Sequence, residues 1–177
     1  MLKAWNRGES DAAERLATAL YPSLRRLAGA RLSQWPHEVS LQATELAHEV
    51  YFKLLGQTQT TWRNRTQLYA VLARLMRRQL VDYVRHRSRQ KRGGHLDAIT
   101  LDASMLAIEG RAVEILALDA ALAELASIDE TAVRVVETLF FGGLTHDEAA
   151  EALGLGRATV GRKWRFARAW LKKRLAV

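Results

Sequence analysis

The stretch LTHDEAAEALGLGRATVGRKWRFARAWLKKRL, residues 144–175, decides how the fold of this chain is interpreted. Thr145 and Glu148, three positions apart, form a capping box in which the hydroxyl and the carboxylate satisfy otherwise unpaired amides at a helix start. Gly154 supplies the left-handed residue that ends such a helix, and a second helix is expected to begin near Arg157. The stretch therefore predicts two helices joined by a tight turn, which is the arrangement of a helix-turn-helix.

The second helix of this stretch, expected over 157–175, carries eight basic residues and no acidic residue. Val160, Trp164 and Ala167 have the spacing of a face that packs inward. In a helix-turn-helix the start of the second helix reads base edges in the major groove, and charges further along meet phosphates. The candidate DNA contacts in this helix are Arg157, Thr159, Arg162, Lys163, Arg165 and Arg168. The alternative is an ordinary solvated basic face on a terminal helix.

The rest of the chain is also expected to be helical, which makes the fold class all-α. Only two prolines occur, both near the beginning of the chain, and residues that favour helices dominate the remainder. Residues 93–112 lack a sustained apolar period and are interpreted as a flexible linker. The expected organisation is two small helical domains, 1–92 and 113–177, joined by that linker. Helix breaks are expected in the second domain at 127–129 and 141–143.

Charge is distributed unevenly along the chain. Residues 63–92 carry ten basic residues and one acidic residue, whereas residues 93–142 carry two basic and nine acidic residues. The basic segment favours a polyanionic partner. Trp62, Tyr69 and Tyr83 offer rings on which unpaired bases can stack, which suits single-stranded DNA. An equal alternative for Trp62 and Tyr69 is a place in the hydrophobic core.

Several function classes are disfavoured by what the sequence lacks. There is no cysteine, which removes disulfides, thiolate catalysis and cysteine-ligated zinc. The five histidines lie in separate segments without ligand spacing, and no P-loop, GxSxG or Rossmann glycine pattern occurs. No apolar run is long enough to span a membrane. We expect a cytoplasmic protein that is not an enzyme and that holds no metal and no cofactor.

Two further stretches give the chain a resemblance to a known family. LQATELAHEVYFKLLG (41–56) and LYAVLARLMRRQLVDYVRHRSRQKRGG (68–94), followed by the helix-turn-helix, are together similar to sigma-70-family factors of the extracytoplasmic-function (ECF) class. The resemblance implies an alternative sigma factor that binds promoter DNA and core RNA polymerase, the latter through its β′ clamp coiled coil and β flap. It assigns polymerase and the minus-10 element to the domain 1–92, and the minus-35 element to the domain 113–177.

The resemblance also implies roles for individual residues of the first domain. Glu45 and Glu49 would face the polymerase. The minus-10 contacts would be Trp62, Arg63, Asn64, Arg77, Arg78 and Arg85. Arg78 stands where the family usually has an asparagine. The arginine can still contribute to DNA affinity through its positive charge, but the base preference at this position is left open.

The start of the polymerase-binding stretch departs from the family, because Gln42-Ala43-Thr44-Glu45 replaces an acidic cluster. In factors that share this departure, threonine phosphorylation is thought to restore the charge, since a phosphate adds about −1.5 to −2 charges. The candidate threonines are Thr44, Thr58, Thr60 and Thr61. The regulatory partner would then be a Ser/Thr kinase, with an anti-sigma factor as the other candidate. Each threonine has the alternative of being an ordinary polar position.

A second function class stays open from the sequence alone. The chain can be interpreted as a stand-alone DNA-binding regulator with an N-terminal sensor or dimerisation domain. The basic charge of residues 63–92 favours the sigma factor, because a sensor domain has no need to hold single-stranded DNA.

Overall fold

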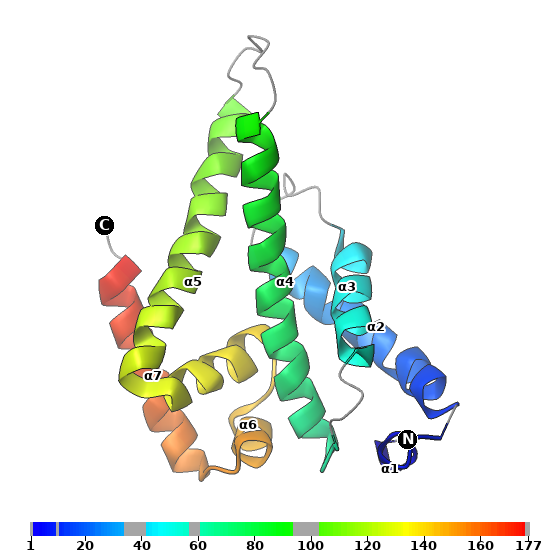
Figure 1. Ribbon diagram of the computed structural model, residues 1–177. Helices are drawn as coiled ribbons and strands as arrows, with labels where there is room; N and C mark the ends of the chain where they lie inside the picture. Colours follow the sequence, from blue (N-terminus) through cyan, green and yellow to red (C-terminus); the bar gives the residue numbers. More distant parts are fainter. Residues whose placement is uncertain (1, 10, 34–41, 57–60, 94–102, 176–177) are drawn as a thin grey trace.

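The structure, a computed structural model, describes residues 2–9, 11–33, 42–56, 61–93 and 103–175. Within these ranges the chain forms helices and no strand, so the prediction of an all-α fold is confirmed (Figure 1). The helices are α1 Leu2–Asn6, α2 Ala12–Leu32, α3 Ala43–Leu55, α4 Arg65–Gly93, α5 Ala103–Val136, the π-helical turn η1 Glu137–Phe141, α6 His146–Leu153 and α7 Arg157–Leu175. We call residues 2–93 the N-terminal module and residues 103–175 the C-terminal module.

The N-terminal module is held together by apolar stripes at helical spacing. The buried stripes are Leu16, Leu20 and Leu24 in α2, Leu46, Val50 and Leu54 in α3, and Leu68, Leu72 and Met76 in α4. Residues four positions apart lie on one face of a helix, so each stripe faces its neighbours as a continuous apolar surface. The stripes pack α2 on α3 and α3 on α4.

The C-terminal module bends at the positions where breaks were expected. Asp129 has non-helical angles, φ −155° and ψ 88°, and its side chain accepts a hydrogen bond from the amide of Ala132 at 3.0 Å. This carboxylate therefore caps the helical segment that follows the kink. The second break follows Phe141, where Gly143 adopts φ 65°, a left-handed conformation that favours glycine.

Half of the segment expected as a linker is helical. Residues 94–102 lie outside the described residues, and residues 103–112 belong to α5. The prediction of a flexible linker over 93–112 is therefore wrong for its second half. The segment 103–112 is rich in alanine and other helix-forming residues. Extending an existing helix costs less than starting one, so this segment can be helical although it has no apolar period of its own.

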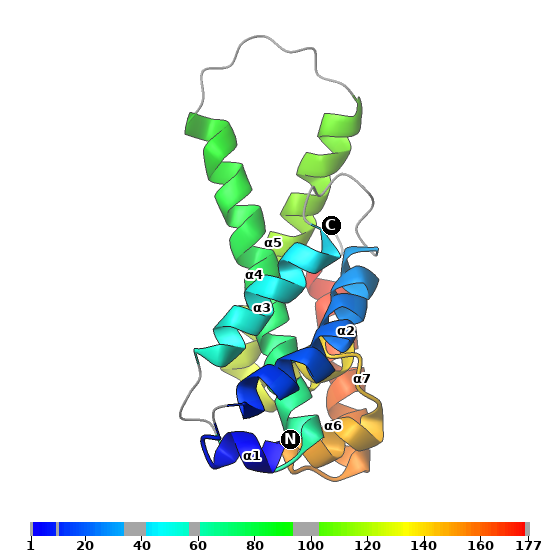
Figure 2. The same cartoon turned by 90° about the vertical axis from the view of Figure 1, so that its right-hand side faces the viewer.

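The two modules pack against each other in this arrangement. Figure 1 shows α4 between α3 on one side and α5 on the other, and α4 also contacts η1 and α6. One core cluster includes Leu72 of α4, Leu122 of α5 and Phe141 of η1. A Cβ atom at Gly142 would lie 3.0 Å from Cβ of Ala73, which shows how closely the backbone after η1 approaches α4. In the second view the last turns of α4 and the first turns of α5 splay apart (Figure 2).

The capping box at α6 gives a first testable prediction. The amide of Glu148 donates to Oγ1 of Thr145, and the amide of Thr145 donates to the Glu148 carboxylate at 2.8 Å. Thr145→Ala is expected to lower the free energy of unfolding by about 1 kcal/mol at neutral pH, measured by urea denaturation. Thr18→Ala, at an exposed position inside α2, is the control and should leave stability nearly unchanged.

The same cap predicts a pH dependence. Hydrogen bonds from the backbone and the hydroxyl of Thr145 lower the pKa of the Glu148 carboxyl. A lowered folded-state pKa contributes stability that is present above the unfolded pKa and is lost as pH falls through the folded pKa. The stability difference between the native chain and Thr145→Ala should therefore shrink on acidification. A difference that stays constant down to the acid transition would contradict this role of Glu148.

Candidate nucleic-acid interface

Helix α7 has two faces of opposite character. Val160 and Ala167 are fully buried and Trp164 is half-buried, so the inward face predicted from their spacing is confirmed. The outward face carries the exposed side chains of Arg157, Arg162, Arg165, Arg168, Lys172 and Lys173. Because α7 contains no acidic residue, nothing on the same helix opposes the approach of a polyanion.

Helix α6 positions α7 through a small apolar contact. Ala149 and Ala150 of α6 form one buried cluster with Val160 of α7 and Val135 of α5. Alanine side chains are short, so α6 and α7 approach each other closely. Gly154 ends α6 in the left-handed conformation, with φ 66° and ψ 35°. The helix start, the helix end and the turn predicted from residues 144–175 are all present.

The candidate DNA-contacting arginines of α7 differ in the hydrogen bonds and ion pairs that they form within the protein. Nε of Arg157 lies 3.2 Å from a carboxylate oxygen of Asp147 in α6, and both side chains are well exposed. Arg162 donates to the hydroxyl of Thr159 at 3.2 Å. Arg165 has no hydrogen-bond or ion-pair partner within the described part of the chain. These exposed pairs are weak, so the arginines can exchange them for DNA oxygens.

Two further candidates have neighbours within the C-terminal module. Lys163 forms an ion pair with Asp129 at the kink of α5. Burial raises the pKa of Asp129, but hydrogen bonds from Lys163 and from the amide of Ala132 outweigh burial and lower it. Lys163 thus ties α7 to α5 in this arrangement. The guanidinium of Arg168 lies over the ring of Trp164, 5.9 Å from its centroid, and stays exposed.

Trp62 lies in the core and not on the surface. Its side chain is 2 % exposed, so the core alternative describes this residue. The side chain of Asn6 fixes its backbone, donating to the Trp62 carbonyl at 2.8 Å and accepting from the Trp62 amide at 2.9 Å. A ring with this burial cannot stack on a base, so the expected DNA contact of Trp62 is corrected. Tyr69 is half-buried, and its hydroxyl accepts a hydrogen bond from Arg65 at 3.2 Å.

Asn64 caps the start of α4. Its side-chain oxygen accepts from the amide of Gln67 at 2.8 Å, and the Gln67 side chain accepts from the amide of Arg63 at 2.9 Å. The two hydrogen bonds resemble a capping box, except that Gln67 accepts from the residue before the cap, Arg63, and not from Asn64 itself. The Asn64 amide group also donates to Glu151 of α6 at 3.0 Å. Arg63 itself is exposed.

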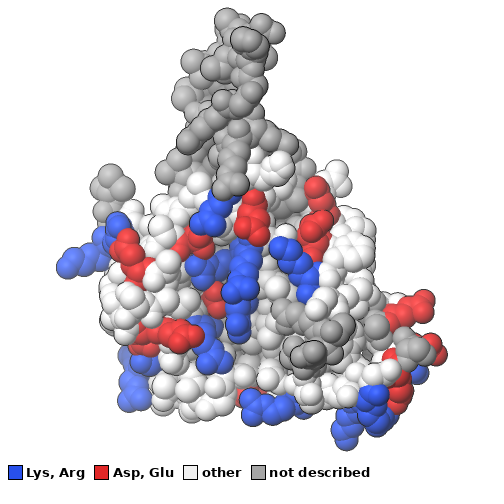
Figure 3. All heavy atoms as spheres, in the orientation of Figure 1, with Lys and Arg blue, Asp and Glu red and all other residues white. Residues whose placement is uncertain are grey.

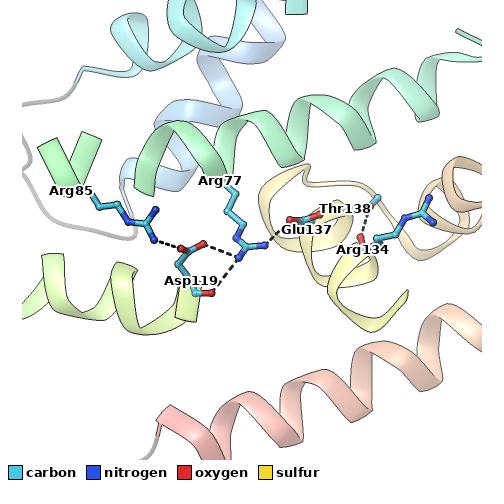
Figure 4. A network of polar contacts seen from close by, with 6 residues as sticks. All are labelled: Arg77, Arg85, Asp119, Arg134, Glu137 and Thr138. Carbon is cyan, nitrogen blue, oxygen red and sulfur yellow. Dashed lines mark hydrogen bonds and ion pairs between the residues drawn. The ribbon is translucent and has the colours of Figure 1, made fainter. Parts of the chain in front are cut away.

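The arginines of α4 divide between solvent and the C-terminal module. Arg78 is exposed, whereas the side chain of Arg77 is only 14 % exposed. Arg77 contacts a carboxylate oxygen of Asp119 at 2.8 Å and one of Glu137 at 2.7 Å (Figure 4). Arg85 contacts the other carboxylate oxygen of Asp119 at 3.0 Å. The two carboxylates belong to α5 and η1, and sequence analysis did not single them out.

The surface charge reflects this pairing between modules. On the face viewed in Figure 1, acidic side chains lie beside basic ones over the middle of the molecule (Figure 3). Among the described side chains of the basic segment, Arg77 and Arg85 therefore have acidic partners in this arrangement, whereas Arg63 and Arg78 are exposed.

The comparison with protein families decides what kind of protein this is. The family model described as ECF sigma factor matches residues 1–177. The chain belongs to the ECF sigma factor family. The comparison with curated proteins found no match. Members of the family are alternative sigma factors that bind core RNA polymerase and promoter DNA, and they regulate transcription without being enzymes.

In this ECF sigma factor, α3 presents an exposed face with mixed chemistry. Glu45 and Glu49 are exposed on it, as the predicted role requires. Phe52, one helical turn further along, is 65 % exposed. Sequence analysis missed Phe52, because an apolar residue in an amphipathic helix is normally assigned to the core. Aromatic residues are enriched at protein-binding surfaces, so the exposed Phe52 marks α3 as a candidate for one.

The candidate threonines are placed differently. Thr44 lies in the first turn of α3 and is half-buried, and Thr61 is exposed just before α4. Thr58 and Thr60 lie outside the described residues.

The described residues contain no cluster of histidine, aspartate or glutamate that could hold a metal ion. None of the helices in the described ranges is long and apolar enough to cross a membrane.

Proposed function

We propose that this ECF sigma factor reads a promoter in two parts while α3 docks on the β′ clamp coiled coil of core RNA polymerase. In this proposal α7 contacts the minus-35 element, and α4 with the loop before it contacts the minus-10 element. The observation that carries the proposal is the outward face of α7, which is basic, exposed and free of acidic residues.

The start of α7 and its later turns have different roles in the minus-35 contact. Arg157, Thr159 and Arg162 lie in the first turns, which enter the major groove in a helix-turn-helix. An arginine there can donate two hydrogen bonds to guanine. Arg165 and Arg168 lie further along the helix and meet phosphates, which position the protein without reading sequence.

The minus-10 contact uses residues just before α4 and along it. Arg63 and Asn64 directly precede the helix, and Arg77, Arg78 and Arg85 lie along its length. Of the arginines, Arg63, Arg78 and Arg85 are exposed, and their positive charge supports binding to a separated strand.

Reconstitution with core RNA polymerase tests the proposed function. The purified protein is added to core enzyme on genomic DNA, and transcript starts are mapped. The expected result is initiation at sites that share two upstream elements and that core enzyme alone does not use. Unchanged starts, together with no binding to core enzyme, would overturn the proposal.

Two substitutions on α7 separate positioning from reading. Arg165→Ala is expected to weaken duplex binding on all sequences alike and to reduce the log–log salt slope by about 0.9. Arg162→Ala is expected to cost about 1–3 kcal/mol on the preferred site and also to relax base preference. Fluorescence anisotropy on mapped and scrambled minus-35 duplexes measures both effects.

Arg26→Ala, which removes an exposed arginine from α2, is the charge-matched control and should change neither quantity. If Arg165→Ala and Arg162→Ala affect mapped and scrambled duplexes identically, the division of roles is wrong.

Threonine phosphorylation by a Ser/Thr kinase is part of the proposal. The position of Thr44 in the first turn of α3 supports it, because a helix N-terminus stabilises negative charge. The exposure of Thr61 makes that hydroxyl accessible to a kinase. Glu substitutions at Thr44, Thr58, Thr60 and Thr61 are made separately, and the substitution at the phosphorylated position should raise affinity for core polymerase. Equal core binding by all four variants and by the unmodified protein would remove the phosphorylation step from the proposal.

A further inference from the structure

We propose that a cavity between the N-terminal and C-terminal modules binds a compact anion of the phosphate class. The cavity has a volume of about 110 Å³. Its charged lining consists of Arg63 before α4, Arg74 of α4, Arg134 of α5 and Glu137 of η1. Arg74 and Arg134 have no part in the proposed contacts with promoter or polymerase, so this site goes beyond the proposed function.

The three arginines of the cavity lack acidic partners. The side chains of Arg63, Arg74 and Arg134 are exposed, and within the described residues none of them forms an ion pair. A carboxylate oxygen of Glu137 lies 2.7 Å from a guanidinium nitrogen of Arg77, so the negative charge of Glu137 is already compensated. Figure 4 shows the Arg134 side chain directed away from that ion pair. The lining therefore presents three positive charges without a counterion from the protein.

Other arginines at the same junction do have acidic partners. Arg77 contacts both Asp119 and Glu137, and Arg85 shares Asp119. The carboxylates of α5 and η1 thus compensate the arginines further along α4 and not those of the cavity. Placing three guanidinium groups around one cavity costs electrostatic energy, because like charges repel. An anion bound among them offsets this cost.

The cavity also offers hydrogen-bond donors that suit phosphate oxygens. A guanidinium presents its N–H groups in a planar fork that matches two oxygens of a phosphate. Gln67 and Arg74 are seven positions apart and share one face of α4. The side-chain oxygen of Gln67 accepts from the Arg63 amide at 2.9 Å, which leaves the Gln67 amide nitrogen as a neutral donor. Because Arg134 belongs to α5, the donors come from both modules.

The size of the cavity selects a small ligand. A single water needs about 10–15 Å³ of such space, so a cavity of about 110 Å³ has room for a group of several heavy atoms. Pockets for drug-sized ligands measure about 300–1,000 Å³, so a nucleoside is too large. The cavity therefore fits inorganic phosphate, or the terminal phosphate of pyrophosphate or of a nucleotide.

Isothermal titration calorimetry on the purified full chain tests the site. Inorganic phosphate and pyrophosphate are the probes, and sodium chloride keeps the ionic strength constant. We expect one binding site per chain and tighter binding of pyrophosphate, because it carries more negative charge. If neither probe binds, the proposal is wrong. It is also wrong if many equivalent weak sites are found, since the net charge of +8 alone then explains the binding.

Substitutions in each module locate the bound anion. Arg74→Ala and Arg134→Ala, made separately, are each expected to weaken pyrophosphate binding about tenfold, because each removes charge-assisted hydrogen bonds. Both side chains are exposed, so the variants should fold, which urea denaturation verifies. Arg26→Ala removes the same charge from an exposed position on α2 and should leave the affinity unchanged. An equal loss in Arg26→Ala, or no loss in either cavity variant, would contradict the proposed site.

A third probe identifies the source of the phosphate group. Adenosine triphosphate can place its terminal phosphate in the cavity while its nucleoside stays outside. If it binds as tightly as pyrophosphate and Arg134→Ala weakens this binding, the ligand is the phosphate tail of a nucleotide. If only inorganic phosphate and pyrophosphate bind, the ligand is a free anion.

Thermal unfolding provides a second readout. A ligand that binds only the folded chain stabilises it by mass action, so pyrophosphate at about 100 times its Kd should raise Tm by about 5 °C. Some anions also stabilise proteins without a specific site, so Arg74→Ala/Arg134→Ala serves as the reference. The double variant should lose most of the rise in Tm. An equal rise in the native chain and in the double variant would overturn the proposal.

Discussion

Replacing Arg77 with alanine is expected to lower the free energy of unfolding by about 3–5 kcal/mol, the range observed when one partner of a buried ion pair is removed. The substitution leaves Glu137, whose side chain is 10 % exposed, without its guanidinium, and leaves Asp119 with Arg85 alone. A buried carboxylate without a partner has lost its hydration and gains no hydrogen bond in exchange, which destabilises the folded state. Urea denaturation followed by circular dichroism measures the loss.

Arg78→Ala is the matched control for this prediction. Arg78 is the next residue on α4, and its replacement removes the same positive charge. Unlike that of Arg77, the side chain of Arg78 is exposed. Its stability change is expected to stay within about 0.5 kcal/mol, as for most surface substitutions. If both variants lose the same stability, the bridge between α4, α5 and η1 contributes nothing specific to the fold.

The C-terminal helix pair was predictable because its signals are local. The capping box of Thr145 and Glu148 and the left-handed Gly154 act within one helical turn of the boundaries that they set. The kink at Asp129 was predictable for the same reason. The spacing of Val160, Trp164 and Ala167 similarly identified which side of α7 packs inward.

The contacts of the proposed minus-10 residues could not be predicted from local sequence signals. Arg77 and Asp119 are 42 positions apart, and Asn64 and Glu151 are 87 positions apart. Charge counts showed that a basic segment precedes an acidic one, but helical spacing does not determine which side chains meet after the chain turns back. Trp62 illustrates a related difficulty, because a tryptophan beside arginines is compatible with stacking on a base and with a place in the core.

The proposed contact residues differ in how far the C-terminal module engages them. Family membership identifies a protein that works bound to polymerase and promoter DNA. In the structure the C-terminal module packs on α4, and its carboxylates contact Asn64, Arg77 and Arg85. By contrast, the outward faces of α3 and α7 remain exposed. The faces proposed to bind polymerase and the minus-35 element are therefore accessible in this arrangement, whereas these three proposed minus-10 residues have partners within the protein.

The exposed face of α3 leads to the second large effect. Phe52→Ala is expected to weaken binding to core polymerase about 30-fold, which corresponds to the loss of about 2 kcal/mol from an interface anchor. Glu45, Glu49 and Phe52 follow each other at intervals of four and three residues and therefore share one helix face. Phe52 is 65 % exposed, so its removal should leave the free energy of unfolding nearly unchanged.

Phe166→Ala serves as the control for Phe52→Ala, because Phe166 is another exposed aromatic, 42 % accessible, on α7. Biolayer interferometry with immobilised core polymerase measures both variants, and urea denaturation verifies that both are folded. Phe52→Ala should lose affinity mainly through faster dissociation, as is usual when an interface anchor is truncated. If Phe166→Ala loses as much affinity as Phe52→Ala, or if neither loses any, α3 is not the face that docks. If only Phe52→Ala is weakened, the aromatic side chain that follows Glu45 and Glu49 on this face anchors the polymerase contact, and Thr44 lies near its N-terminal edge.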